Sequence, residues 1–332
     1  MGNIERLTED ELAEAGEITG AVSGALDEQV VGQERLKTAM LVALLAEGHL
    51  LVESVPGLAK TLASSTLAHA VSASFSRIQC TPDLLPSDIV GTQVYDPRDH
   101  SFETQLGPVH ANIVLLDEIN RASAKTQSAM LEAMQERQTS IGGQIHPLPR
   151  PFVVLATQNP IEQEGTYVLP EAQMDRFLLK EVLDYPTADE EMSVLDRVED
   201  GTLSRAPASV GVVGPADIRR LQSLAQRVYV DTAVKRYIVD LVHATRSARA
   251  TLGPELGAYV ETGASPRGTI TFFHVARALA ILNGRAFAVP EDVRALRHSV
   301  LRHRLHLTFE ALADRVAPET LIDAVFGAVP TP

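Results

Sequence analysis

The segment from Leu50 to Thr61 constrains the fold more than any other stretch of the chain. It places a short apolar strand, a turn of small residues and a Lys-Thr pair in that order. The order is typical of a phosphate-binding loop, G-x-x-x-x-G-K-[ST], although Ser54 and Ala59 stand where the template has glycines. Backbone N–H groups and the helix dipole at the start of the next helix attract phosphate oxygens whichever small residue carries them.

We therefore expect this loop to bind a nucleotide. The alternative is a strand-turn-helix corner in which the Lys-Thr pair is incidental. The expected site residues are Ser54, Val55, Pro56, Gly57, Leu58, Ala59, Lys60, Thr61 and Leu62.

A second apolar run, 113–116, has the composition of a central parallel strand that is buried on both faces. It ends in Asp117 and Glu118, at the strand end where open α/β sheets bind their ligands. A solvated strand end is the alternative. We expect Lys60 to reach the terminal phosphates, and Thr61 and Asp117 to hold Mg²⁺. Glu118 would polarise the attacking water.

Three further polar side chains are candidates for the same chemistry. Asn159 follows the apolar run 152–156, where an amide can hold the attacking water, or it is only a turn former before a proline. Arg176 ends a short helical segment and has no evident partner in the predicted strand order, so it could act on a neighbouring subunit's nucleotide. Arg267 begins a later helix and could face the phosphates; otherwise it is a surface arginine.

The chain divides into two predicted domains, as its length of 332 residues suggests. Strand and helix patterns alternate up to residue 186, which indicates an α/β domain with a parallel sheet. Turn residues predict β-hairpins near 94–102 and 139–148. After residue 187 the strand signals stop, and 199–214 is expected to be a loop or linker. Helices are expected at 189–198, 215–228, 232–250, 266–283 and 290–303.

Composition narrows the classes of protein that the chain can belong to. The formal net charge of −14 argues against a broad nucleic-acid surface, because Lys and Arg supply most nonspecific affinity for phosphates. No apolar run approaches the eighteen or so residues needed to span a bilayer, and the acidic N-terminus does not resemble a secretion signal. We therefore expect a cytoplasmic protein.

Few side chains suit a structural metal. The single cysteine, Cys80, excludes disulfides within the chain and a cysteine-based metal site, and we expect it to be half-buried. His298, His303 and His306 lie near Arg302 and Arg304. A solvated helix end explains this cluster better than a metal or anion site does, because it has no acid or cysteine at ligand spacing.

Taken in order, Lys60-Thr61, Asp117-Glu118, Asn159, Arg176 and Arg267 resemble the signature of AAA+ ATPases, and within them the MoxR family. The resemblance covers nearly the whole chain. Its sequence blocks are 31–33, 55–61, 81–88, 117–121, 131–137, 156–176, 265–268 and 301–304.

This resemblance implies an AAA+ P-loop core, 1–186, with a parallel five-stranded sheet and β-hairpin inserts, followed by an all-helical lid, 187–332. The two hairpins would be the helix-2 insert and the pre-sensor-1 hairpin. By the same resemblance Asn159 is sensor 1, Arg176 is the arginine finger and Arg267 is sensor 2. Val31 and Gly32 are expected to contact the nucleotide.

The resemblance also implies a function. MoxR-like proteins hydrolyse Mg-ATP at the subunit interfaces of a ring, most often a hexamer. They act as chaperones that remodel a client or enzyme complex, typically with a partner that carries a von Willebrand factor A domain. The alternatives are a nucleic-acid motor, which the acidic balance opposes, and a nucleotide-gated scaffold with little hydrolysis.

Ser54 is the one departure from the MoxR pattern in the loop, since the family usually has glycine there, whereas Ala59 is ordinary for the family. If the backbone at Ser54 requires a positive φ, the serine would cost about 1 kcal/mol and weaken nucleotide binding.

Overall fold

The computed structural model describes residues 6–160, 167–201 and 213–332. Most of the linker predicted at 199–214 therefore lies outside the described residues. The chain forms two compact units. An α/β unit comprises Ile18–Arg176 and Glu181–Arg220, and a second, mainly helical unit comprises the N-terminal residues to Glu17 together with Phe177–Lys180 and Leu221–Pro332.

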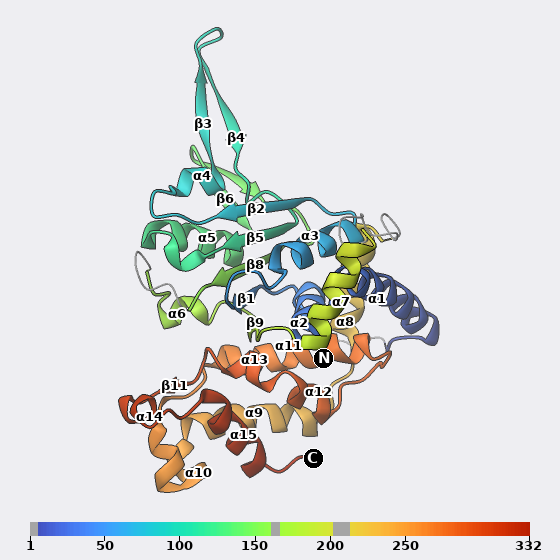
Figure 1. The fold of residues 1–332 in the computed structure, drawn as a ribbon, viewed down its shortest axis with the longest axis vertical. Helices are drawn as coiled ribbons and strands as arrows, with labels where there is room; N and C mark the ends of the chain where they lie inside the picture. Colours follow the sequence, from blue (N-terminus) through green and yellow to red (C-terminus); the bar gives the residue numbers. More distant parts are fainter. Residues whose placement is uncertain (1–5, 161–166, 202–212) are drawn as a thin grey trace. The chain divides into compact units, whose positions relative to one another are not determined.

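A five-stranded sheet organises the α/β unit (Figure 1). Its spatial order is β2-β5-β8-β1-β9, and the register pairs β2 with β5, β5 with β8 and β8 with β1 in parallel. The central strands β5 and β8 are buried at every position except the last, as their apolar sequences predict. The strands are β1 (Leu50–Glu53), β2 (Phe75–Gln79), β5 (Ile113–Asp117), β8 (Val153–Gln158) and β9 (Leu179–Val182).

Parallel strands bring their carboxyl ends to one edge of the sheet. In the observed register Glu53 lies opposite Gln158, and Gln79 lies opposite Asp117. The loops that leave β1, β5 and β8 therefore start side by side, and this edge is where an open α/β sheet binds its ligand. The parallel five-stranded sheet that the sequence predicts is confirmed.

Helices flank this sheet. The α3 helix packs against β2 and β5, and α2 packs against β1. The α1 helix, which both units share, begins with a capping box: Glu11 N–H donates to the Thr8 hydroxyl, and Thr8 N–H donates to the Glu11 carboxylate. The helices of this part of the chain are α1 (Glu9–Gln29), α2 (Glu34–Leu45), α3 (Lys60–Ala70), α4 (Pro86–Val90), η1 (Ile119–Arg121), α5 (Ala124–Glu136), α6 (Glu171–Met174) and α7 (Ala188–Glu199).

Both predicted hairpins are present. The strands β3 (Gly91–Asp96) and β4 (Ser101–Leu106) pair antiparallel and extend away from the sheet as a long arm (Figure 1). The second hairpin joins β6 (Gln138–Ile141) to β7 (Gln144–Pro147). Its two turn residues are glycines with φ of 57° and 80°, a conformation that L side chains disfavour.

The second unit is built from helices around an aromatic core, in which the rings of Tyr237 and Phe272 both pack against Phe326. Among the described residues no helix is long and apolar enough to span a membrane. The helices are α8 (Pro215–Arg227), which the two units share, α9 (Thr232–Arg246), α10 (Ala248–Leu256), η2 (Gly257–Tyr259), α11 (Pro266–Leu282), α12 (Pro290–Ala295), α13 (Arg297–Leu301), α14 (Phe309–Ala313) and α15 (Pro318–Ala328).

Some helix bounds in this unit differ from the sequence prediction. The helix expected at 232–250 stops at Ser247, whose hydroxyl donates to the carbonyl of His243, and α10 is itself kinked at Gly253 before a proline. The helix expected at 290–303 breaks at Leu296, where φ is −112° and ψ is 27°. Strands also do not stop after residue 187, because the short strands β10 (Val260–Thr262) and β11 (His306–Leu307) pair antiparallel.

Candidate active site

A pocket of about 450 Å³ lies at the carboxyl edge of the sheet in the α/β unit. Its walls come from the loop after β1, the start of α3 and the ends of β2, β5 and β8. The residues that line it are Ser54, Pro56, Gly57, Leu58, Ala59, Lys60, Thr61, Leu62, Arg77, Gln79, Asp117, Glu118, Thr157 and Asn159. The loop, the two acids and the asparagine that the sequence singled out therefore share one pocket.

The backbone of the loop carries its strain at an unexpected residue. Gly57 has φ of 89°, and Ala59, the N-cap of α3, has φ of 54° and ψ of 18°. Ser54 is not among the residues with positive φ. The condition under which serine at position 54 would cost binding is therefore not met, and Ala59 instead adopts a left-handed conformation that costs a residue with a Cβ about 1–2 kcal/mol.

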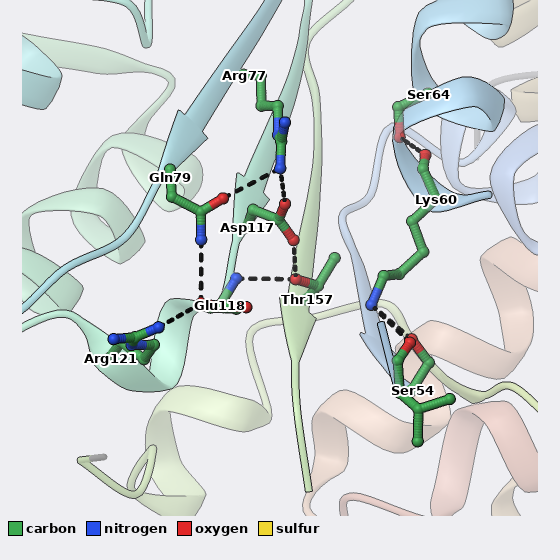
Figure 2. Close-up of polar contacts among 10 residues, drawn as sticks. Ser54, Lys60, Ser64, Arg77, Gln79, Asp117, Glu118, Arg121 and Thr157 are labelled. Carbon is green, nitrogen blue, oxygen red and sulfur yellow. Dashed lines mark hydrogen bonds and ion pairs between the residues drawn. The ribbon is translucent and has the colours of Figure 1, made fainter. Parts of the chain in front are cut away.

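Ser54 contributes a side-chain contact that the sequence did not predict. Its buried hydroxyl accepts a hydrogen bond from the Lys60 ammonium at 2.6 Å and donates to the Val55 carbonyl at 3.1 Å (Figure 2). Burial lowers the pKa of Lys60, while the nearby carboxylates of Asp117 and Glu118 act to raise it. Since glycine has no hydroxyl, Ser54 gives Lys60 a hydrogen-bond partner that glycine at this position could not provide.

Asp117 is held by two neighbours at the end of β5. One carboxylate oxygen accepts a hydrogen bond from the Thr157 hydroxyl at 2.7 Å, and the other forms an ion pair with Arg77 at 2.6 Å (Figure 2). The Asp117 side chain is only 13% exposed. Its orientation is therefore fixed from two sides.

Hydrogen bonds also fix the position of Glu118, whose backbone is in a strained conformation. Its φ of 56° and ψ of 53° are left-handed, and its N–H donates to the Thr157 hydroxyl at 2.8 Å. The carboxylate accepts hydrogen bonds from Gln79 at 3.0 Å and from Arg121 at 3.1 Å (Figure 2). Strained residues that the surroundings over-determine are common at functional sites. Thr157 thus orients both acids at once.

Three pocket residues, Arg77, Gln79 and Thr157, were absent from the sequence prediction. Thr157 stands at the end of a buried strand just before Asn159, so the strand-end rule that selected Asn159 could have found it. Arg77 and Gln79 alternate along β2, an edge strand, where polar residues are common and carry little signal.

The remaining predicted residues lie elsewhere. Val31, Gly32 and Val55 do not line the pocket. Arg176 follows α6 and also does not line it, and its buried Nε has no hydrogen-bond partner among the residues that the structure describes. Arg267 belongs to the second unit, at the first turn of α11, where its N–H donates to the N-cap hydroxyl of Ser265.

The oxygen donors in the pocket suit a magnesium ion. Asp117 offers a carboxylate and Thr61 a hydroxyl, and Mg²⁺ prefers hard oxygen ligands supplemented by substrate phosphates. Elsewhere, no group of three or more His, Cys, Asp or Glu side chains within the described ranges is placed to hold a metal.

Comparison with known proteins decides the family. Residues 49–179 match the ATPase family associated with various cellular activities (AAA), and residues 257–325 match the AAA lid domain. The chain is 48% identical over 303 residues to Chaperone MoxR1 of Mycobacterium tuberculosis, which covers 91% of this chain and 79% of that protein. This chain belongs to the MoxR family of AAA+ ATPases.

Other MoxR relatives and a solved structure agree with this assignment. Protein MoxR of Paracoccus denitrificans is 33% identical over 326 residues, which are 93% of this chain and 94% of that protein. The crystal structure of a protein from Cytophaga hutchinsonii has a TM-score of 0.90 at 40% identity and covers 98% of both chains. The AAA+ α/β fold with a helical lid is thereby confirmed.

Two side-chain predictions for this MoxR chain are wrong. Cys80 is fully buried rather than half-buried, and burial, helped by nearby carboxylates, raises the pKa of its thiol to about 12. The histidine cluster is not a solvated helix end, because His303 and Arg304 are each only 3% exposed. His298 does lie at the surface, where it contacts Asp323 at 2.8 Å.

Proposed function

We propose that this MoxR-family chain hydrolyses Mg-ATP at the interfaces of a homo-oligomeric ring, a hexamer, and couples the reaction to remodelling of a partner protein. The observation that carries the proposal is that Lys60, from the start of α3, and Asp117 and Glu118, from the end of β5, line the same pocket. These are a cation for the phosphates, an oxygen ligand for Mg²⁺ and a carboxylate to polarise water.

Each residue has a separate task in this reaction. Lys60 would leave the Ser54 hydroxyl and bind the terminal phosphates of ATP. Thr61 and Asp117 would hold Mg²⁺, which when bound neutralises charge on the phosphates. Glu118 would accept a proton from the attacking water, which Asn159 would help to position.

Arg176 would complete the site of the neighbouring subunit. Its Nε finds no hydrogen-bond partner in the described part of its own chain, and its side chain does not line its own pocket. An arginine supplied in trans stabilises charge on the transferred phosphoryl and is worth about 10³–10⁵ in rate. Turnover would then depend on assembly.

Mixing two inactive variants tests the sharing of the site. Lys60→Ala subunits lack a working pocket but supply Arg176, and Arg176→Ala subunits have the pocket but lack the finger. In a head-to-tail ring made from an equal mixture, about one quarter of the interfaces combine both intact halves. We expect ATP turnover to recover to a comparable fraction of the wild-type rate, measured by phosphate release.

The control is each variant assembled alone, which should stay inactive. Mixed assembly must be verified by native mass spectrometry. Verified mixed rings without recovered turnover would contradict the assignment of Arg176 to the neighbouring site.

The coupled task is protein remodelling. The Mycobacterium tuberculosis relative is named a chaperone. By the same family resemblance we propose a client enzyme complex and a partner with a von Willebrand factor A domain. We also propose a cytoplasmic location.

A further inference from the structure

The four residues that follow Arg176 are bound by the helical unit. Phe177–Lys180 group with that unit although they continue the chain directly from Arg176. Their backbone carbonyls accept hydrogen bonds from three consecutive side chains beyond the end of α13, Arg302, His303 and Arg304, which we call the α13 clamp.

Arg304 and His303 bind the two carbonyls nearest to Arg176. The Arg304 guanidinium donates to the Phe177 carbonyl at 2.6 Å and to the Leu178 carbonyl at 3.1 Å. His303 Nε2 donates to the same Phe177 carbonyl at 3.1 Å. Two donors on one carbonyl, together with a fully buried Phe177 side chain, fix this residue in the unit.

The third member binds further along the segment. Arg302 donates to the Lys180 carbonyl at 2.9 Å, and it forms an ion pair with Glu319 of α15 at 2.7 Å. The clamp therefore connects the segment to two helices.

Burying the charged side chain of Arg304 costs free energy, and hydrogen bonds to backbone carbonyls offset that cost. A buried guanidinium is tolerated only when it is hydrogen-bonded, and the Arg304 guanidinium donates to the carbonyls of Phe177, Leu178 and Val300. Burial, and then the positive charge of Arg304, lower the pKa of His303 well below its ordinary value, so the ring is neutral. All three clamp side chains therefore bind backbone carbonyls of the segment that follows Arg176.

We infer that the α13 clamp is a positioning device for Arg176, so that the helical unit of one subunit places the arginine that serves its neighbour. This rests on the proposed role of Arg176 in trans. Consecutive Cα atoms are held about 3.8 Å apart, so the position of Phe177 limits where Arg176 can lie. A misplacement of about 1 Å can cost roughly 10²-fold in rate.

A second route from the clamp to catalysis must be separated from this one. The Cδ atom of Arg304 lies 3.6 Å from the place where a Cβ on Gly268 would be, next to Arg267. Loss of Arg304 could therefore disturb Arg267, which would act on the pocket of its own subunit or of another. If Arg267 acts on the pocket of its own subunit, the two routes differ in which inactive subunit restores the activity.

The test uses Arg304→Lys in the full-length ring, because lysine keeps the charge but loses the planar fork. Alone, this variant should bind ATP as tightly as wild type and turn over on the order of 10²-fold more slowly. Mixed with Lys60→Ala subunits it should regain turnover, and mixed with Arg176→Ala subunits it should not. Arg302→Met is run in parallel, in case Arg304→Lys does not fold.

Arg297→Met is the matched control, since Arg297 begins α13, the helix that leads into the clamp, but pairs with Asp323. It should retain wild-type turnover. Recovery of Arg304→Lys with Arg176→Ala subunits would overturn the inference, and so would wild-type turnover of the variant alone. Failure of Arg304→Lys with Lys60→Ala, while Lys60→Ala and Arg176→Ala complement each other, contradicts the clamp alone. If that reference pair also fails, the trans role of Arg176 is contradicted.

Discussion

Ser54 shows how one hydroxyl can tune a phosphate loop without straining it. Its backbone does not need the conformational freedom of glycine, and its side chain holds the Lys60 ammonium at 2.6 Å. In the proposed reaction Lys60 would give up or share this bond when it binds phosphate. A typical hydrogen bond contributes about 1 kcal/mol net, and one to a charged group somewhat more.

We predict that Ser54→Gly leaves ATP affinity unchanged or tightens it by up to about tenfold, because Lys60 no longer exchanges one partner for another. Isothermal titration of ATP measures this. Ser54→Ala is the control, since it removes the hydroxyl without adding glycine's flexibility, and it should behave in the same way. A tenfold weaker affinity in both variants would show that the hydroxyl contacts the nucleotide itself.

At the same scale, the sequence predicted the pocket residues that follow central strands and missed those that support them. Lys60 is identifiable because a lysine in a phosphate-binding loop stands just before a threonine at the start of a helix. Asp117 and Glu118 are identifiable because they follow a central parallel strand, where open α/β sheets bind their ligands. Arg77 and Gln79 are visible only once the register of β2 on β5 is known, because that register sets them beside the two acids.

Among the elements, one buried histidine joins two parts of the sheet unit. His49 immediately precedes β1; its Nε2 donates to the Met134 carbonyl of α5, and its Nδ1 accepts from the Val154 N–H of β8, both at 3.1 Å. Both ring nitrogens are therefore used by the neutral form. Burial, with a smaller effect of Arg137, lowers the pKa of His49 to about 4.

This lowered pKa predicts the direction of an acid effect on stability. Below pH 6.5 the His49 ring binds a proton in the unfolded chain, whereas in the folded chain it stays neutral down to about pH 4. The contribution of neutral His49 to the free energy of unfolding is complete above pH 6.5. It decreases as the pH falls, and by pH 4 the loss is on the order of 3 kcal/mol. The denaturant midpoint as a function of pH measures it.

The His49→Gln variant should be less stable at pH 7 but should show a flatter fall between pH 6.5 and pH 4. His100→Gln, at the exposed turn of the β3-β4 hairpin, is the control and should retain the wild-type slope. An unchanged slope in His49→Gln would contradict the assignment.

Element boundaries were predicted well where turn chemistry or burial is strong. The paired glycines of the β6-β7 turn and the apolar runs of β5 and β8 are local signals. The helix breaks at Ser247 and Leu296 leave no such local signal, because the segments on both sides of each break have a helical pattern. The strands β10 and β11 are only three and two residues long, too short to show a period.

For the whole molecule, a change in sequence pattern predicts the division into two units. The pattern does not predict which unit contains the segment Phe177–Lys180. The β9 strand (Leu179–Val182) belongs to the five-stranded sheet, yet its first two residues, with Phe177 and Leu178, group with the helical unit. Only the side chains of Arg302, His303 and Arg304, more than a hundred residues away, reveal this, and sequence spacing carries no sign of such a contact. The formal charge of −14 still opposes a nucleic-acid motor.

The central claim is that the pocket of this MoxR-family chain hydrolyses ATP with Glu118 as the group that activates water. The most direct measurement compares ATP affinity and steady-state phosphate release of wild type and Glu118→Gln at equal ring concentration. The amide keeps the shape of the side chain and removes the base, so we predict retained ATP binding and a loss of turnover of at least about 10²-fold. Undiminished phosphate release by Glu118→Gln would contradict the account.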